Sequence, residues 1–261
     1  PKNIFGFDSV SMNNQLPVSP IEWFEDNGLI QSNWTGYEKR LTQLDLIQDV
    51  YDAFSDNYIL VAEAGPGLGK SLAYLSAGFL AARKNDRPLV VSTYTKNLQE
   101  QLFEKDIPQL STSLNLIINS VIYKGRYNYI CRTRLQSIIT NHALLLTSQE
   151  YEALLILIVW EWETQTGDIN ECNGFLINKY KRLWSLVCSE RGFCSTNRCG
   201  KFEGCYLGKL REKVKDADII IVNHSLFANE LQRDNTCLPD DYTYVIDEAH
   251  HFANVIRSQL V

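Results

Sequence analysis

A glycine-rich loop between two regular elements constrains the fold of this chain more than any other feature. Residues 64–71 read AGPGLGKS, after the apolar run Tyr58–Val61 and before the Ala- and Leu-rich segment Lys70–Arg83. The apolar run predicts a buried strand, and the second segment predicts a helix. Backbone N–H groups of such a loop close around phosphate oxygens at the helix N-terminus, and the lysine adds positive charge. The predicted phosphate-binding residues are Gly65, Gly67, Gly69, Lys70 and Ser71.

An acidic motif follows another short apolar run, far along the chain. Residues 247–250 read DEAH. The Ser71 hydroxyl and Asp247 are suited to hold Mg²⁺ from two sides. Glu248 is then placed to orient or deprotonate a water that attacks the γ-phosphate. The two motifs in this order predict a nucleoside triphosphatase site, with Lys70, Asp247 and Glu248 as its catalytic residues.

Apolar runs and helical periodicity elsewhere indicate an α/β fold. Continuous apolar strands that alternate with helices are typical of a parallel sheet covered on both faces. Residues 1–35, which contain Pro, Asn and Ser, predict an extension with little regular structure. Residues from about 124 to 215 show helical periodicity and few strand signals. The other predicted strands are Pro88–Ser92, Leu116–Tyr123, Asp218–Val222 and Tyr242–Ile246, and the other predicted helices are Gln43–Phe54 and Lys96–Lys105.

Hydropathy and cysteine content predict a cytoplasmic enzyme core. The longest apolar run, Leu154–Trp160, is too short to span a membrane and lies between Glu152 and Glu161, so it predicts a buried helix. The N-terminus lacks the basic and then apolar pattern of a signal peptide. Seven cysteines, an odd number, do not indicate a disulfide framework.

Four of the cysteines form a candidate metal site. Cys194, Cys199 and Cys205 are separated by four and five residues, and Cys131 lies far upstream. Four thiolates can hold a [4Fe–4S] cluster or a zinc ion. The intervals are wider than those of the usual zinc knuckle, which favours iron–sulfur modestly and leaves the metal open. The remaining three are expected to be buried, inert thiols: Cys172, Cys188 and Cys237.

Positive charge is concentrated in two segments of an acidic chain. The whole chain carries −6, whereas residues 122–140 carry +4 and residues 179–215 carry +7. Such a concentration is expected of a protein that binds a polyanion, although a solvated surface gives the same pattern. Aromatic residues among the basic ones favour single-stranded nucleic acid, because bases stack on rings. These residues are Tyr123, Tyr127, Tyr129, Phe193, Phe202 and Tyr206.

Together these motifs resemble the iron–sulfur helicases of superfamily 2, in particular the DinG-like proteins and relatives such as XPD. The resemblance runs from Tyr37 to about Asn254. Residues 37–43 (YEKRLTQ) are similar to the family's adenine-reading motif, and residues 92–102 (STYTKNLQEQL) to its first strand-contacting motif. The segment KGRYNYIC, which ends at Cys131, resembles the start of the family's cluster domain, and VNHSL, which begins at Val222, resembles its end.

The resemblance implies a fold, ligands and site residues. It implies a RecA-like motor domain with a parallel sheet, made of residues 36–123 and 216–261 after the extension 1–35. A mainly helical insertion, residues 124–215, would carry a [4Fe–4S] cluster on the four cysteines. Gln43 would read the adenine of ATP. The residues implied to contact nucleic acid are Thr95, Lys124, Arg126, Tyr127 and Arg132.

The resemblance also implies an activity. It implies ATP-driven movement on single-stranded DNA and 5′→3′ unwinding of duplexes, including fork or flap structures, in repair or replication. Single-stranded DNA-binding protein is an implied partner. The family's arch domain and second motor domain, with its arginine fingers, would follow Val261. We therefore expect this chain to be a fragment. Because an arginine finger contributes about 10³–10⁵ in rate, we expect the chain to hydrolyse ATP slowly by itself.

Two other classes of protein fit part of the pattern. One is a zinc-stabilised nucleic-acid-binding module whose phosphate loop is no longer catalytic. The intact Lys70, Asp247 and Glu248 argue against that loss. The other is a regulatory or transport ATPase with an unrelated cysteine insert, which would not require stimulation by single-stranded DNA.

Overall fold

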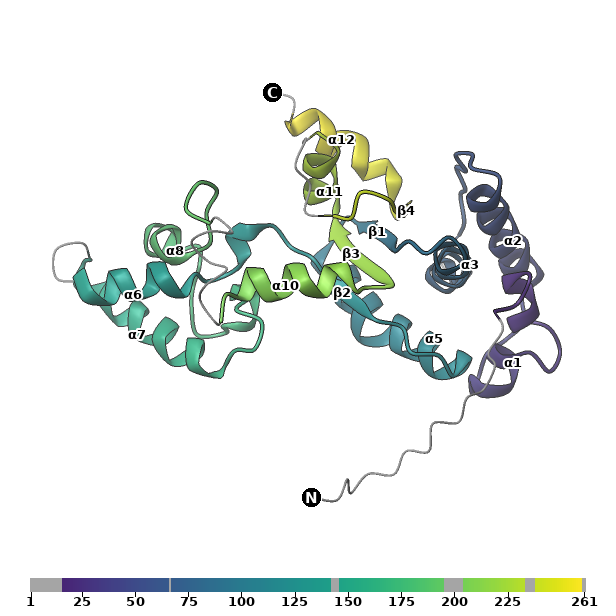
Figure 1. Ribbon diagram of the computed structural model, residues 1–261, viewed down its shortest axis with the longest axis horizontal. Helices are drawn as coiled ribbons and strands as arrows, with labels where there is room; N and C mark the ends of the chain where they lie inside the picture. Colours follow the sequence, from purple (N-terminus) through teal and green to yellow (C-terminus); the bar gives the residue numbers. More distant parts are fainter. Residues whose placement is uncertain (1–15, 66, 142–145, 195–203, 233–237, 260–261) are drawn as a thin grey trace, which may run out of the picture.

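The computed structural model describes residues 16–65, 67–141, 146–194, 204–232 and 238–259. Its centre is a parallel sheet whose strands lie in the order β2-β3-β1-β4 (Figure 1). Val90 lies opposite Ile220 on one side and Tyr244 on the other, and Val121 also pairs with Ile220. The prediction of an α/β fold with a parallel sheet is therefore confirmed. The strands are β1 (Leu89–Thr93), β2 (Ser120–Ile122), β3 (Ile219–Asn223) and β4 (Thr243–Ile246).

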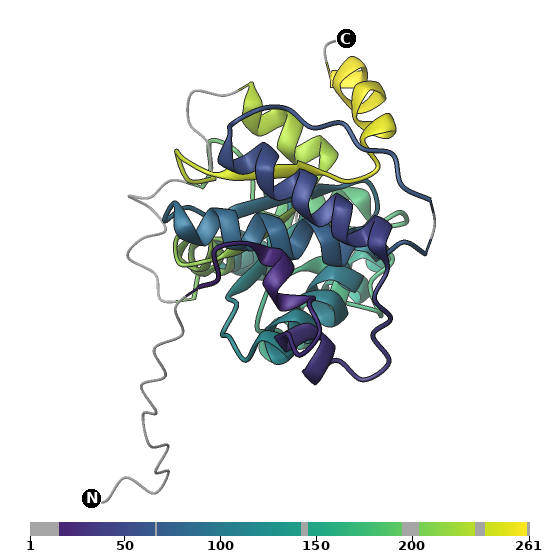
Figure 2. The same cartoon turned by 90° about the vertical axis from the view of Figure 1, so that its right-hand side faces the viewer.

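Alternate side chains of the central strands enter two different hydrophobic clusters. Leu89 and Ile219 pack with α2 (Leu41–Ser55) and α3 (Lys70–Lys84) on one face of the sheet. Figure 2 shows these two helices in front of the strands. Val90 and Ile220 point to the other face, where α10 (Tyr206–Lys215) and α11 (His224–Leu231) pack. Since both faces are covered, the strands read as uninterrupted apolar runs.

A π-helical turn interrupts the helical segment that follows β1. The segment comprises α4 (Lys96–Gln101), the π turn η2 (Leu102–Asp106) and α5 (Ile107–Leu114). Pro108 lacks an N–H to donate to the preceding turn, and its ring would clash with that turn in a regular helix. The wider π turn accommodates this proline. The π turn also brings Asp106 toward the start of α3, where Asp106 and Ser71 line the same cavity.

Two predictions about local structure are wrong. Tyr58–Val61 forms no strand, and the Ile59 and Val61 side chains are 84% and 91% exposed. An apolar run makes a strand only where a neighbouring edge offers hydrogen bonds, and no described strand pairs with this one. The part of the extension that the structure describes, residues 16–35, is also more ordered than expected. It contains η1 (Pro20–Trp23) and α1 (Leu29–Asn33), and buries Trp23, Phe24 and Ile30 in the core.

The segment between β2 and α10 builds its own hydrophobic cluster to one side of the sheet (Figure 1). Leu157, Leu183 and Trp184 are fully buried there. Between Lys124 and Lys215 the described part is helical apart from isolated bridges. The elements ahead of α10 are η3 (Arg126–Asn128), α6 (Arg132–Asn141), α7 (Ser148–Glu163), η5 (Ile169–Glu171) and α8 (Lys181–Val187). We call this segment, residues 124–215, the insertion.

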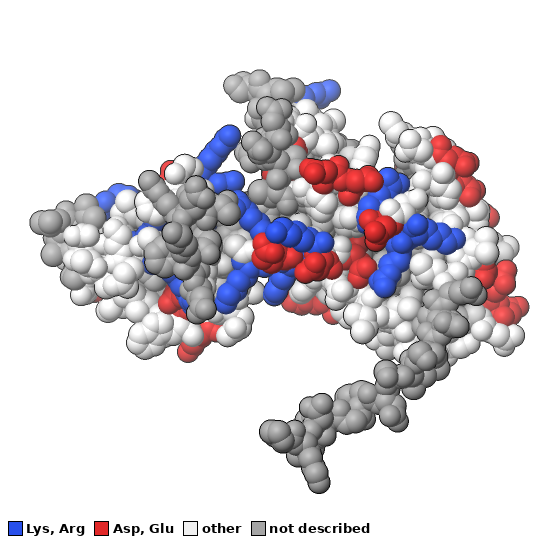
Figure 3. Space-filling model, viewed as in Figure 1, with Lys and Arg blue, Asp and Glu red and all other residues white. Residues whose placement is uncertain are grey.

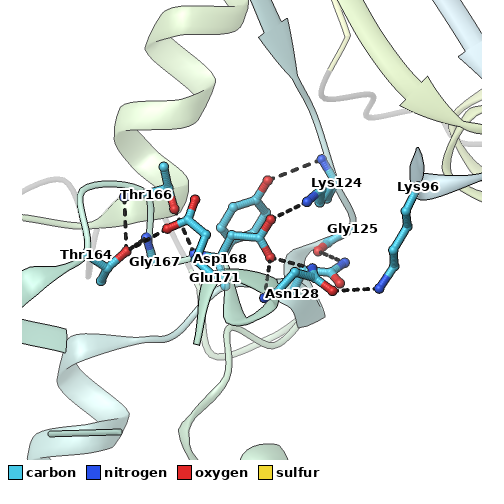
Figure 4. Close-up of polar contacts among 11 residues, drawn as sticks. Lys96, Lys124, Gly125, Asn128, Thr164, Thr166, Gly167, Asp168 and Glu171 are labelled. Carbon is cyan, nitrogen blue, oxygen red and sulfur yellow. Dashed lines mark hydrogen bonds and ion pairs between the residues drawn. The ribbon is translucent and has the colours of Figure 1, made fainter. Parts of the chain in front are cut away.

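A polar network joins the insertion to the sheet (Figure 4). Lys124, just after β2, forms a buried ion pair with Asp168. Asp168 Oδ1 accepts a 2.6 Å hydrogen bond from the side chain of Asn170. Lys96 Nζ, at the start of α4, donates to Asn170 Oδ1 over 2.6 Å. The segment after β2, through Lys124, and the helix after β1, through Lys96, therefore both contact the same loop of the insertion.

The last helix, α12 (Ala249–Gln259), follows the acidic motif, and its Phe252 packs against the cluster of α10 and α11. Within the described ranges no helix has the length and apolar character needed to cross a bilayer.

Candidate functional site

The glycine-rich loop adopts a backbone that only glycine accepts readily. Gly67 and Gly69 both have φ of +81°, the left-handed region. Gly69 is the N-cap of α3, and its carbonyl accepts from Ala73 N over 3.1 Å. A Cβ on Gly69 would lie 2.2 Å from Gln43 Nε2. Lys70 therefore begins α3 at the end of the helix where backbone N–H groups and the dipole favour an anion.

The acidic motif meets this helix from the end of β4. Lys70 Nζ lies 3.6 Å from Glu248 Oε1. Asp247 N donates to Ser92 O over 2.9 Å, which continues the pairing of β4 with β1 into the motif. Glu248 has φ of +54°, and it turns its side chain away from the line of the strand toward Lys70. The fold thus brings together the three residues that sequence reasoning proposed as catalytic.

A cavity of about 500 Å³ lies beside the loop, between α2, α3 and the π turn. Gln43 is buried at its wall and donates from Nε2 to Gly69 O over 3.1 Å. Tyr37 Oη donates to Gln43 Oε1 over 3.2 Å, and Arg40 hydrogen bonds to the carbonyl of Gly67. The segment predicted to read adenine is therefore connected directly to the phosphate loop. The residues that line the cavity include Trp34, Tyr37, Arg40, Gln43, Ser71 and Asp106.

Tyr74 is a site residue that sequence reasoning missed. It lies one turn after Ser71 on α3, is 7% exposed, and donates from Oη to Asp247 Oδ2 over 3.1 Å. Burial raises the pKa of the Tyr74 phenol well above its ordinary value, and the negative charge of Asp247 adds to this. The phenol therefore keeps its proton and remains a donor. Its three-residue spacing from Ser71 is the sequence signal that could have revealed it.

His224 is a second missed residue, buried at the start of α11 beneath the acidic motif. Its Nδ1 lies 2.8 Å from Ser92 Oγ, and its ring packs edge-on against Phe252 with centroids 5.3 Å apart. Burial lowers the pKa of His224, while the backbone of Glu248 opposes the shift. The imidazole of His224 therefore favours its neutral form and packs between Ser92 and Phe252, next to the turn that carries Glu248. Sequence reasoning placed this histidine only in the motif after the insertion.

Comparisons with known proteins agree with this geometry. No family model matches the chain. Over 228 residues, 86% of its length, it is 32% identical to the 3′-5′ exonuclease DinG of Bacillus subtilis (strain 168). Over 239 residues, 89% of its length, it is 31% identical to the ATP-dependent DNA helicase YoaA of Escherichia coli (strain K12). The chain is thus similar in sequence to DinG and YoaA proteins over most of its own length.

The similarity extends to the ATP-dependent helicase DinG of Mycobacterium tuberculosis (strain ATCC 25618 / H37Rv), at 31% identity over 240 residues. The chain spans between a quarter and just over a third of the length of these relatives: 24% of the Bacillus protein and 36% of the other two. The parallel sheet with its phosphate loop is consistent with a RecA-like domain of a DinG-like helicase.

Chain neighbours of the candidate cysteines, but not a complete ligand set, meet at the start of α6 in the described residues. Arg132, next to Cys131, packs so closely on Gly204 that a Cβ there would lie 2.1 Å from its guanidinium. Arg134 lies over the ring of Phe193, with 5.3 Å from Cζ to the centroid. The chain neighbours of Cys205 and Cys194 therefore both reach the first turn of α6. Cys199 lies outside the described residues, as does Cys237.

Among the residues that the structure describes, no group of three His, Cys, Asp or Glu side chains is arranged to hold a metal ion. Two of the cysteines expected to be inert are indeed buried. Burial raises the pKa of Cys172, and it raises that of Cys188 to about 11. Both thiols therefore stay protonated at neutral pH. Because metals bind the thiolate form, neither cysteine is suited to be a ligand.

The residues expected to contact nucleic acid differ in accessibility. Thr95 is exposed and accepts from Leu98 N over 3.2 Å as the N-cap of α4, and Tyr127 is 47% exposed. The ammonium of Lys124 is not on the surface, because it is buried against Asp168. The guanidinium of Arg132 is ion-paired with Glu161 and donates to Tyr206 Oη over 2.8 Å.

Arg126 is half-buried, and no ion pair involving it is found among the described side chains. Lys and Arg side chains gather in the middle of the face in Figure 3, with Asp and Glu side chains among them. Much of the positive charge that the sequence concentrates in the insertion is therefore used in internal pairs. The accessible candidates for nucleic-acid contact are Thr95, Arg126 and Tyr127, together with Arg132, whose side chain stays 45% exposed beside Glu161.

Proposed function

We propose that this chain is the nucleotide-binding motor part of a DinG-like ATP-dependent DNA helicase. The observation that carries the proposal is the meeting of Lys70 with Glu248 and of Tyr74 with Asp247 across two elements far apart in the sequence. A phosphate loop at a helix N-terminus, opposite an acidic pair at a strand end, is the arrangement that nucleotide hydrolysis requires.

The geometry suggests how each side chain acts. In the nucleotide-free protein Lys70 pairs with Glu248. The phosphates of ATP compete for the ammonium and release the carboxylate of Glu248, which then accepts a proton from the attacking water. Ser71 and Asp247 would hold Mg²⁺, which neutralises phosphate charge when bound. Gln43 would contact the adenine from the wall of the neighbouring cavity.

We propose further that single-stranded DNA binds across α4 and the start of the insertion, at Thr95, Arg126 and Tyr127. The complete protein would unwind fork or flap DNA in the 5′→3′ direction during repair or replication. A [4Fe–4S] cluster on Cys131, Cys194, Cys199 and Cys205 would give the insertion structural support. Full hydrolysis would require a second motor domain that supplies an arginine finger.

Binding of a fluorescent ATP analogue to the purified chain tests the proposed nucleotide site. We expect Lys70→Ala to weaken binding by roughly 10- to 100-fold, because a charge-assisted contact to phosphate is lost. Lys84→Ala, at the far end of the same helix, is the matched control and should bind like the wild type. Glu248→Gln should keep nucleotide binding and lower the residual hydrolysis about 10²- to 10⁴-fold.

Two outcomes would contradict the proposal. Equal nucleotide binding by the Lys70→Ala variant and the wild type would exclude this loop as the phosphate site. Hydrolysis that single-stranded DNA neither stimulates nor inhibits, together with no measurable DNA binding, would instead favour a regulatory ATPase.

A further inference from the structure

The phenol oxygen of Tyr74 contacts one of the two side chains assigned to the cation, and Tyr74 lies one helical turn from the other. Oη donates to Asp247 Oδ2 over 3.1 Å. Ser71 and Tyr74 are three residues apart on α3, so they share one face of the helix. Asp247 reaches the same point from the end of β4. One oxygen atom therefore links the loop helix to the acidic motif.

The carboxylate of Asp247 is held through both of its oxygens. Oδ2 accepts from Tyr74, and Oδ1 accepts from the backbone N of Glu248 over 3.0 Å. Hydrogen bonds to an ionised carboxylate are stronger than those between neutral groups. Each oxygen has further lone pairs, so the carboxylate remains able to bind a cation while its orientation is fixed.

A role in packing alone does not explain the hydroxyl. The ring of Tyr74 belongs to the hydrophobic cluster of α2 and α3, where a phenylalanine ring would fill the same space. The phenol oxygen is the atom that hydrogen bonds into the site. A buried tyrosine usually finds a partner for its hydroxyl, and here that partner is Asp247, a candidate ligand of the cation.

We propose that Tyr74 is a positioning residue of the nucleotide site, which orients Asp247 for the divalent cation that accompanies the nucleotide. The inference rests on the proposed function, since it assigns a role within the same site. Residues that orient metal ligands typically change metal affinity 10- to 100-fold when they are replaced. The phosphate loop would contact the nucleotide without any involvement of the Tyr74 side chain.

The test is Tyr74→Phe, with binding of a fluorescent ATP analogue measured over a range of Mg²⁺ concentrations and in excess chelator. We expect the Mg²⁺ concentration for half-maximal enhancement of binding to rise roughly 10-fold or more. Binding in chelator should stay within about twofold of the wild type, because the phosphate loop is intact. A packing role would change the melting temperature and leave the Mg²⁺ dependence as it was.

Tyr51→Phe is the matched control. Tyr51 lies on the neighbouring helix α2, and its hydroxyl donates to Val18 O over 2.9 Å and accepts from Lys84 Nζ over 2.8 Å. This variant therefore also loses the hydrogen bonds of a phenol, at a position away from the site. We expect its Mg²⁺ dependence to match the wild type. An unchanged Mg²⁺ dependence in Tyr74→Phe would overturn the inference, as would an equal shift in both variants.

The result also separates the inference from the proposed function. If Lys70→Ala abolishes binding and Tyr74→Phe leaves the Mg²⁺ dependence unchanged, the nucleotide site stands and Tyr74 has no role in cation binding. If neither variant alters binding, the proposed site itself is wrong. Should the Tyr74→Phe protein melt below the assay temperature, Asp247→Asn, which keeps the Tyr74 ring in place, should likewise raise the Mg²⁺ concentration for half-maximal enhancement. A wild-type Mg²⁺ dependence in Asp247→Asn would overturn the inference, since Asp247 would then not hold the cation.

Discussion

Gly69 is the residue at which the phosphate loop and the adenine segment are most tightly coupled. Its left-handed backbone and the 2.2 Å separation expected between an added Cβ and Gln43 Nε2 leave no room for a side chain. Left-handed conformation costs a non-glycine residue about 1–2 kcal/mol before any clash is counted. The position therefore requires glycine for two independent reasons.

We expect Gly69→Ala to weaken binding of an ATP analogue at least about tenfold, because the alanine displaces Gln43 and shifts the loop. Circular dichroism should show that the fold is retained. Gly125→Ala is the control, since its Cβ would meet only Asn128 Nδ2 at 3.7 Å and its φ is ordinary. Unchanged binding in the Gly69→Ala protein would contradict the proposed contact between loop and adenine segment.

Sequence reasoning found the residues of the site that belong to recognisable motifs and missed those that support them. Lys70, Asp247 and Glu248 stand in patterns whose chemistry is independent of the fold. Tyr74 and His224 act through neighbours that only the folded sheet supplies. Lys124 illustrates a different limit, because its positive charge says nothing of the buried Asp168 with which the folded chain pairs it.

At the scale of elements, helices were easier to predict than strands. The helix at Lys70–Arg83 matches α3 within one residue, since its periodicity and its starting loop are local signals. Tyr58–Val61 has the composition of a strand but no partner among the described strands, and pairing is not encoded in the segment itself. The same limit applies to Leu116–Tyr123, of which only the last part pairs, as β2.

The contact between α7 and α8 has a measurable pH dependence. Arg182 Nε donates to Glu150 Oε1 over 2.9 Å, and Thr147 caps α7 together with Glu150. Hydrogen bonds from Arg182 lower the pKa of Glu150 from 4.5 to about 2. Because the pKa in the folded state is depressed, this contribution to stability is complete above about pH 4.5. It is lost as the pH falls from there toward 2.

We expect Glu150→Gln to lower the melting temperature by a few degrees at pH 7, because the ion pair and the capping carboxylate are lost. The difference from the wild type should shrink as the pH falls below about 4.5, since the Glu150 carboxyl of the unfolded chain then takes up a proton while that of the folded protein stays ionised down to about pH 2. Thermal unfolding at a series of pH values measures both effects. Glu152→Gln, an exposed position on the same helix, should show neither. A difference that stays constant down to pH 3 would disprove the coupling to Glu150.

At the scale of the whole molecule, the insertion stands apart from the sheet with a hydrophobic cluster of its own. The first turn of α6 gathers the chain neighbours of three cysteines. Cys188 lies beside this turn, since its carbonyl accepts from Arg134 over 2.9 Å, but burial keeps its thiol protonated. A metal centre there would therefore support the insertion rather than the sheet. Its removal should leave the nucleotide site folded.

Metal analysis of protein purified without oxygen tests this prediction. We expect about four iron and four acid-labile sulfide per chain, the content of one [4Fe–4S] cluster. Cys194→Ser should abolish that content and lower affinity for single-stranded DNA, while binding of the ATP analogue stays unchanged. Cys188→Ser is the control, and its iron content should match the wild type. Zinc without sulfide would rule out the iron–sulfur assignment and favour a zinc-bound module.

The insertion leaves the sheet after β2 and returns through α10 to β3, and these two strands are direct neighbours. Closing a longer excursion costs little, since each doubling of length adds only about 0.6 kcal/mol of loop entropy. The register of Val121 against Ile220 is set by the strands and their core, whatever length of chain separates them. Related proteins can therefore differ in the length or structure of the segment between β2 and β3 while the sheet that carries the nucleotide site keeps its register.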